Sequence, residues 1–308
     1  ETYKIPTPSM EETLLAGDYI FVSKLAYGPR LPETPLAIPF YHNKLPSGKK
    51  SYSEKFKMPH KRLKGFSRVK REDIIVFNFP EGDTMVVQYP GQNYYSLVRQ
   101  YGREYMTSEF EIITHPVDKR ENYIKRCIAL PGDTLQIAEG TIRVNGENRP
   151  ELALQKFKYY VSTRGDPLPD ALLDSLKILK SSVTYNPINS LHVLYLAQQT
   201  VESLKSFPQV RSISRYTEPT LSFQNKEIFP HNDFYRWTGD NFGPIQIPSR
   251  GDTVQINHLN LPIYQRIIDI YEQNELAIID GEIYINGRAA SSYVIQMDYY
   301  FVMGDNNH

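Results

Sequence analysis

A serine in a proline-rich turn and a lysine in an apolar strand are the two residues whose surroundings could support nucleophilic chemistry. Ser9 stands in the segment IPTPSM, and Lys125 interrupts the run YIKRCIAL. A serine hydroxyl is a weak nucleophile until an adjacent base removes its proton, and a lysine can be that base only when it is neutral. Its pKa must then fall from the ordinary value of about 10.4, which burial among apolar side chains can achieve.

Each of these residues also has a simpler interpretation. Ser9 could belong to an ordinary surface turn, since proline and serine are both common in turns. Lys125 could lie on an edge strand, or its apolar stem could carry the amine out to solvent. The residues alone leave both alternatives open.

Short strands separated by turns are the elements that would position these side chains. The chain contains 23 tyrosines and 22 prolines, and its aromatic fraction is 12%. Short β-branched and aromatic runs between turn residues favour a mainly β fold. The alternation of apolar residues predicts a strand over 19–25 and another within 69–80, with 84–90 as the hairpin partner of the second.

One sequence pattern occurs twice. Residues 132–146 read GDTLQIAEGTIRVNG, and GDTVQI at 251–256 together with DGEIYING at 280–287 repeats the pattern around a helical insertion. In each copy a Gly-Asp turn precedes an alternating strand, and an Asn-Gly pair offers the positive φ angles of a tight hairpin turn. The sequence therefore predicts two related hairpins.

Helical spacing predicts three further segments, over 169–180, 190–207 and 260–274. We assign the first two to an inserted cap domain.

The predicted organisation is one β core with a large α+β insertion. The core comprises residues 1–149 and 241–308, with a loop excursion rich in Pro, Gly, Lys and Ser at 28–68, and the inserted cap domain comprises residues 150–240. The ends of the chain are abrupt, so we expect the natural protein to be longer at both ends.

Composition excludes several classes of function. Lysine plus arginine and aspartate plus glutamate both total 35, which gives no indication of a nucleic-acid partner. Cys127 is the single cysteine, and no spacing of Cys and His is typical of a zinc site. No apolar run approaches the roughly 18 to 20 residues that span a bilayer, so we expect this chain to be a soluble fragment.

Four segments resemble the sequence boxes of bacterial type I signal peptidases, in the order of that family. They are KIPTPSMEETLLAGDYIFVSKLAYG, REDIIVFNFP, YIKRCIALPGDTLQI and FVMGDN. The resemblance implies a signal-peptidase-like β-sheet catalytic core. It also implies that Lys125, as a neutral general base, takes the proton of Ser9, and that Ser9 forms an acyl-enzyme hydrolysed by water. The family uses no metal and no cofactor.

The resemblance implies roles for other residues as well. The hydroxyl of Thr7 and the backbone N–H of Ser9 would stabilise the developing oxyanion. Arg126 and Asp305 would support the site by holding two of the boxes together through a charged contact. The residues at the positions of the substrate-binding wall, any of which could instead be core, are Ile5, Met10, Leu14, Tyr123 and Ile124.

The activity implied is that of a membrane-anchored serine endopeptidase. It would cleave N-terminal signal peptides from exported preproteins after Ala-x-Ala-like sites, on the outer, periplasmic side of the bacterial cytoplasmic membrane. Its partners would be the signal peptides and the lipid bilayer. Two alternatives remain: a catalytically inactive peptide-binding module on the same fold, and a self-cleaving SOS-type Ser-Lys repressor. The repressor would require a helix-turn-helix domain, which the sequence before Ser9 does not show.

Overall fold

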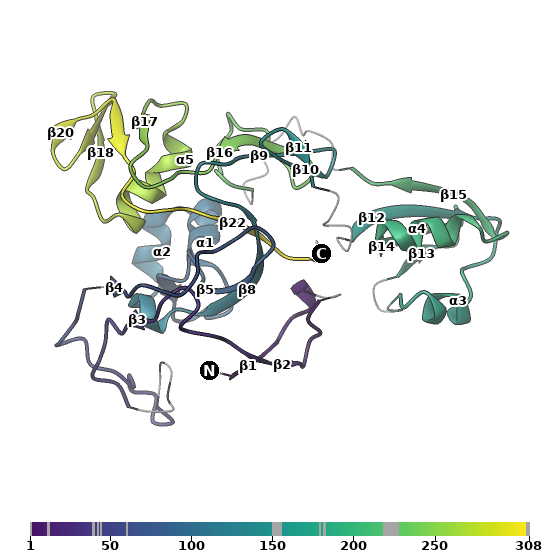
Figure 1. The fold of residues 1–308 in the computed structure, drawn as a ribbon, viewed down its shortest axis with the longest axis horizontal. Coiled ribbons are helices and arrows are strands. Elements are labelled where there is room, and N and C mark those ends of the chain that lie inside the picture. The colour runs from purple at the N-terminus through teal and green to yellow at the C-terminus, as the bar shows by residue number, and fades with distance from the viewer. Residues whose placement is uncertain are drawn as a thin grey trace. The chain divides into compact units, whose positions relative to one another are not determined.

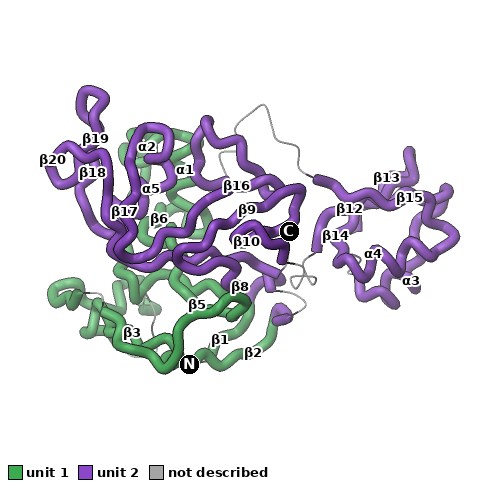
Figure 2. Tube along the Cα trace, turned by 45° about the horizontal axis from the view of Figure 1, so that its top comes forward, with its two compact units in different colours: residues 1–5, 17–126 green, residues 6–16, 127–308 purple. Residues whose placement is uncertain are grey.

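The computed structural model describes residues 2–10, 13–38, 41, 43, 45–59, 61–149, 156–178, 180, 183–217 and 228–305. Strands form most of its regular structure (Figure 1), which confirms the predicted mainly β fold. Contacts divide the chain into two compact units, residues 1–5 with 17–126 and residues 6–16 with 127–308 (Figure 2). None of the helices in the described ranges is long and apolar enough to cross a membrane.

The first unit is built from antiparallel strand pairs and two helices. The pairs are β1 (Thr2–Lys4) with β2 (Tyr19–Phe21), β3 (Arg30–Leu31) with β4 (Lys61–Arg62), β5 (Ile74–Asn78) with β8 (Asn122–Ala129), and β6 (Thr84–Val86) with β7 (Ile112–Thr114). The helices are α1 (Tyr94–Tyr101) and α2 (Arg103–Glu109). Strand β8 continues into the second unit at Cys127.

The predicted hairpin between β5 and the segment 84–90 is wrong. Strand β5 pairs with β8, and β6 pairs with β7. The reason is the packing of β6, because Val86 is fully buried in a cluster with Tyr94 and Leu97 of α1 and Met106 of α2. Burial against these helices therefore decides the partner of β6, and nearness in sequence does not.

The second unit contains two four-stranded sheets. Their strands are β9 (Thr134–Ala138), β10 (Thr141–Val144), β11 (Glu147–Asn148), β12 (Phe157–Thr163), β13 (Thr184–Asn186), β14 (Leu191–Leu196), β15 (Val210–Arg215) and β16 (Phe242–Gln246). The strand orders are β11-β10-β9-β16 and β13-β14-β12-β15, and each sheet has its own hydrophobic cluster. The boundaries predicted for the inserted domain stay predictions.

The remaining elements of this unit belong to its C-terminal part. They are β17 (Thr253–Gln255), α5 (Leu261–Arg266), the π-helix η5 (Ile267–Tyr271), β18 (Leu276–Ile279), β19 (Glu282–Ile285), β20 (Arg288–Ala289), β21 (Ser292–Val294) and β22 (Phe301–Met303). The helix predicted over 260–274 is confirmed by α5 and η5. Phe301 and Met303 of β22 pack against the cluster that holds Ile128 and Ala129.

The predicted repeat has a structural counterpart in its Gly-Asp turns. The Asp133 carboxylate accepts a hydrogen bond from the backbone N–H of Leu130 at 2.7 Å, and Asp252 accepts one from Ser249 at 2.9 Å. An aspartate side chain that binds the backbone three residues earlier closes a turn without help from distant residues. Both copies therefore begin with the same locally closed turn.

The Asn-Gly turns correspond in the same way. The Asn145 side chain accepts from the N–H of Thr134 at 2.8 Å, and the Asn286 side chain accepts from Glu275 at 2.9 Å. Both asparagines have positive φ, 55° and 52°. In the second copy α5 and η5 separate β17 from β18, whereas the first copy uses the single strand β9. The second copy is thus the first pattern interrupted by a helical insertion, as predicted.

The predicted helix over 190–207 is wrong in its first half. Residues Leu191–Leu196 form β14, and only α4 (Gln198–Lys205) is helical. In β14 every second side chain is buried, namely those of His192, Leu194 and Leu196, which is the period of a strand. The predicted helix over 169–180 is confirmed in its first half, where α3 spans Asp170–Ser175.

The carboxylate of Glu272, which follows η5, collects hydrogen bonds from the last part of the chain. It accepts from the hydroxyls of Tyr293 and Tyr299, at 2.5 and 3.0 Å, and from the backbone N–H groups of Gln296 and Met297, at 2.9 and 3.1 Å. Burial, together with the hydrogen bond to this carboxylate, raises the pKa of Tyr293 to about 12. Glu272 therefore anchors the approach to β22.

Replacing Glu272 with alanine is expected to lower the free energy of unfolding by about 2 to 4 kcal/mol, because several donors then lose a charged acceptor. Glu275→Ala is the matched control, since that side chain is exposed, and its effect should stay within about 0.5 kcal/mol. Urea denaturation followed by circular dichroism measures both. Equal stabilities for the two variants would show that Glu272 has no anchoring role.

Candidate active site

Ser9 lies in the middle of a short 3-10 helix, η1 (Pro8–Met10). Met10 is fully buried, and its carbonyl accepts from the N–H groups of Thr13 and Leu14 at 3.1 and 2.8 Å. A buried methionine followed by a closed turn fixes the backbone around a serine that remains half-buried. The segment therefore holds the Ser9 side chain in a defined position while leaving part of it at the surface.

Thr7 and Ser9 are brought together by this turn. The Thr7 hydroxyl donates to the Ser9 hydroxyl oxygen, with 3.4 Å between the oxygens. A hydroxyl donor this close to the Ser9 oxygen can also reach an oxyanion that forms next to Ser9 when the serine attacks a carbonyl group. The geometry is compatible with the predicted oxyanion role of Thr7, which stays a prediction.

Asp305 is connected to the same segment. It is buried, and its carboxylate accepts a hydrogen bond from the Thr13 hydroxyl at 2.7 Å. Charge-assisted hydrogen bonds of this kind are among the stronger ones in proteins. Asp305 thus secures the turn that follows Ser9, a contact that the sequence analysis missed. No signal in a single sequence could have revealed it, since the two residues are 292 positions apart.

Lys125 lies in β8, where it is half-buried. It stands opposite Ile75 of β5, and Phe77 is opposite Tyr123. Because side chains two apart on a strand share a face, and directly opposed residues do so too, the face of Lys125 also carries Tyr123, Cys127, Ile75 and Phe77. The register therefore surrounds the lysine with mainly apolar and aromatic neighbours.

Tyr123 reinforces this environment. Its ring lies 4.6 Å from that of Phe79, centroid to centroid, and burial, followed by the nearby Glu121, raises the pKa of its phenol. A tyrosine that stays protonated adds no charge next to Lys125. The next residue on this face, Cys127, is a buried free cysteine.

Arg126 points to the opposite face of β8 from Lys125 by strand alternation. Its guanidinium donates to the backbone carbonyl of Glu72 at 3.0 Å. This bond fastens β8 to the turn before β5. The predicted charged contact between Arg126 and Asp305 stays a prediction, because the two residues belong to different units.

The residues predicted to form the substrate wall differ in exposure. Ile5 and Met10 are buried, with 3% and 0% of their surface exposed. Their side chains can therefore pack behind a substrate-binding wall but cannot form its surface. Leu14 and Ile124 are half-buried, and Tyr123 is exposed. Met10 and Leu14 belong to the second unit and the other three to the first. A wall formed by all five stays a prediction.

The pairing of Ser9 with Lys125 is likewise a prediction, since Ser9 belongs to the second unit and Lys125 to the first. Within the ranges that the structure describes, no group of three or more His, Cys, Asp or Glu side chains could hold a metal ion. The second unit therefore contains a serine next to a hydroxyl donor, and the first unit contains a lysine in an apolar strand.

Comparison with known proteins agrees with these features. The family described as "Signal peptidase, peptidase S26" matches residues 1–214. Signal peptidase I of Pseudomonas aeruginosa is 30% identical over 149 residues, which cover 48% of this chain and 31% of that protein. Signal peptidase I of Pseudomonas fluorescens is 26% identical over 155 residues, 50% of this chain and 33% of the relative. The chain thus spans about a third of the length of these curated relatives. No solved structure matches it.

Proposed function

This chain belongs to the signal peptidase family, peptidase S26, and on that premise we propose that it carries the catalytic residues of a membrane-anchored serine endopeptidase. The proposed substrates are exported preproteins, cut after Ala-x-Ala-like sites at the end of their signal peptides. The observation that carries the proposal is that the family match covers both Ser9 and Lys125. The turn around Ser9 and the apolar face of β8 support it.

The proposed reaction begins with proton transfer. A neutral Lys125 amine takes the proton of the Ser9 hydroxyl while the oxygen attacks the carbonyl carbon of the scissile peptide bond. The carbonyl oxygen becomes an oxyanion, which the Thr7 hydroxyl and the Ser9 backbone N–H stabilise. The apolar neighbours of Lys125 favour the neutral amine, because burial disfavours the charged form.

Collapse of this intermediate breaks the peptide C–N bond. The proton held by Lys125 passes to the leaving amine, which is the new N-terminus of the mature protein, and the signal peptide remains on Ser9 as an ester. Water then attacks the ester carbonyl while the Lys125 amine takes a proton from that water. The ester C–O bond breaks, Lys125 returns the proton to the Ser9 oxygen, and the signal peptide leaves with a free carboxyl group. The cycle requires no metal and no redox cofactor.

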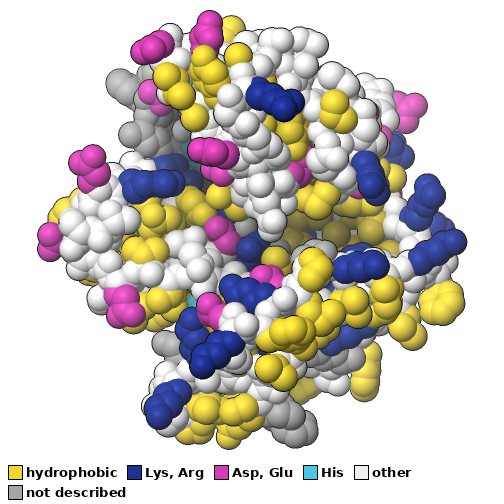
Figure 3. All heavy atoms as spheres, turned by 90° about the vertical axis from the view of Figure 1, so that its left-hand side faces the viewer, with side chains coloured by type: hydrophobic (Ala, Val, Ile, Leu, Met, Phe, Trp, Pro, Cys, Tyr) yellow, Lys and Arg dark blue, Asp and Glu magenta, His cyan; other side chains and the backbone are white. Residues whose placement is uncertain are grey.

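The lipid bilayer is the second proposed partner. On the first unit, large apolar side chains lie exposed, with Phe21 89%, Phe66 88% and Tyr19 72% accessible. Lys24 and Lys64 lie close by in sequence and are also exposed. Figure 3 shows one face of the molecule, where hydrophobic side chains lie among basic and acidic ones. Aromatic side chains beside lysines suit a membrane interface with anionic lipids.

Cleavage of a preprotein tests the proposal. A preprotein with an Ala-x-Ala junction is incubated with the protein in detergent, and the products are mapped by mass spectrometry. We expect one cut after the final alanine, and no cut in a matched preprotein with phenylalanine at that position. Binding of the preprotein without any cleavage would instead indicate the inactive peptide-binding module.

A further inference from the structure

The second unit contains a cavity of about 620 Å³ that none of the candidate-site residues lines. Its wall is drawn from the sheet that contains β12 and from the sheet that contains β9, together with β22 and residues 228–240. Most of the lining is apolar or aromatic, as the side chains of Ile137, Phe157, Phe229, Phe242, Phe301 and Met303 show. A volume of this size is typical of sites for small ligands.

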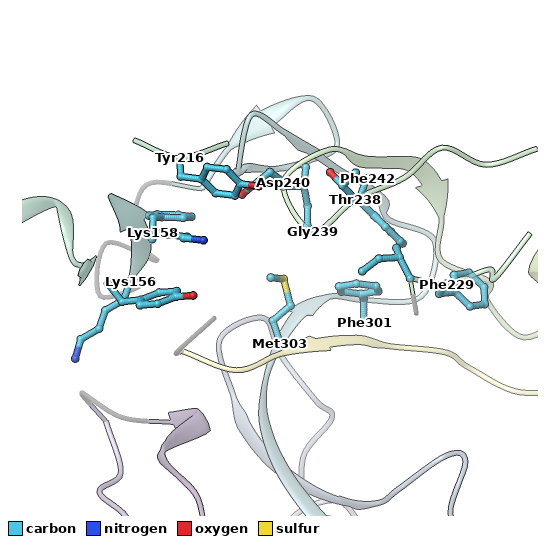
Figure 4. A pocket seen from close by; sticks show the side chains of 14 residues that line it. Lys156, Lys158, Tyr216, Phe229, Thr238, Gly239, Asp240, Phe242, Phe301 and Met303 are labelled. Atoms are coloured by element: carbon cyan, nitrogen blue, oxygen red, sulfur yellow. The ribbon is translucent and has the colours of Figure 1, made fainter. Parts of the chain in front are cut away.

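One cation points into this apolar space. In Figure 4 the amine of Lys158 is directed into the cavity, whereas the side chain of Lys156 extends away from it. The Lys158 amine lies 4.5 Å from the ring centroid of Tyr216 and 6.0 Å from that of Tyr160. Among the residues that the structure describes, no carboxylate forms an ion pair with Lys158. Aromatic faces hold the ammonium in place but do not neutralise it.

The amine of Lys158 favours an anionic group on the ligand. Lys156, Lys158 and Asp240 are the charged residues of the lining, and of the two lysines only Lys158 directs its amine into the cavity. An ammonium at an apolar cavity is stabilised when an anion takes up its hydrogen-bonding capacity. Most of the remaining lining is apolar or aromatic and suits an apolar chain. The ligand therefore needs one anionic group and one apolar chain.

We propose that this cavity binds a single-chain amphiphile of the fatty-acid class. The acyl chain lies against Phe242, Phe301 and Met303, and the carboxylate rests on the Lys158 amine beside Tyr216. Binding is non-covalent and is independent of the peptidase activity proposed above.

The chain contains its own reporter for this site. Trp237 is the single tryptophan, and its ring lies 4.6 Å from that of Phe242, which lines the cavity. Filling the cavity changes the surroundings of that indole. Laurate, kept below its micelle concentration, is titrated into the protein while Trp237 fluorescence is recorded. We expect a saturable change with laurate and at least tenfold weaker binding of monolaurin, which has the same chain and a neutral head group.

Variants of Lys158 and of Lys156, which precedes β12, make the test specific. Lys158→Met removes the charge and keeps the length of the side chain, so it should weaken laurate binding about tenfold. Lys156→Met is the matched control and should change it less than twofold. The proposal is overturned if laurate gives no saturable change, if monolaurin binds equally well, or if both variants behave alike. The comparison of laurate with monolaurin uses the unaltered chain and holds even if a variant folds poorly.

Discussion

Ser9→Ala is expected to lower the rate of preprotein cleavage by about 10⁴-fold or more, because the variant lacks the oxygen that forms the acyl-enzyme. The fold should survive, since the hydrogen bond between the Thr7 and Ser9 hydroxyls lies on an exposed turn and the buried Met10 is unchanged. Cleavage is measured by mass spectrometry, and the thermal unfolding midpoint is measured beside it.

Ser47→Ala provides the control for this variant, because Ser47 is an exposed serine in a turn of the loop excursion. It should cleave at the rate of the unaltered protein. Persistent cleavage by Ser9→Ala, at a rate near that of the control, would falsify the assignment of the nucleophile.

Lys125→Met is expected to reduce cleavage by about 10³-fold or more, since the methionine has similar length but cannot accept a proton. The pH profile gives an independent readout. Cleavage by the unaltered protein should rise with pH, because the fraction of neutral amine rises as protons are withdrawn. The residual cleavage by Lys125→Met should lack this rise.

Lys70→Met is the control for the charge change, because Lys70 is exposed and stands outside β8. Its rate and pH profile should match those of the unaltered protein. If Lys125→Met kept both the rate and the rise with pH, another group would have to be the base.

Much of the fold follows from local chemistry that a sequence displays. The turns of Asp133 and Asn145 are closed by side chains that bind the backbone within their own hairpin, so the repeat could be identified by inspection. The strand around Lys125 could be predicted for a similar reason, because the alternation of apolar residues is a local property of the sequence.

The wrong predictions concern strands whose conformation or pairing depends on residues that are distant in the sequence. Strand β6 pairs with β7 because α1 and α2 cover Val86, and no feature of residues 84–90 records that contact. In β14, leucines and a buried histidine also fit a helical spacing, and only packing against the neighbouring strands selects the strand. Sequence patterns cannot separate these possibilities for short apolar runs.

The candidate site was predictable to a similar extent. Ser9, Thr7 and Lys125 could be identified from short segments that resemble a known family. The contact of Asp305 with Thr13 could not, because it joins opposite ends of the chain. The burial of Met10 could not be predicted from the sequence either, since an apolar residue beside a nucleophile can belong to a substrate-binding wall or to the core.

The interrupted repeat has a consequence for local unfolding. In the first copy β9 is hydrogen-bonded to β10 on one side and to β16 on the other, so opening either ladder disturbs the other. In the second copy two different strands make the corresponding pairings, because β18 pairs with β19 and β17 pairs with β21. The helices α5 and η5 lie between β17 and β18 in the sequence. Amide hydrogens of the first copy should therefore exchange with solvent as one cooperative group, and those of the second copy as two groups with separate opening free energies.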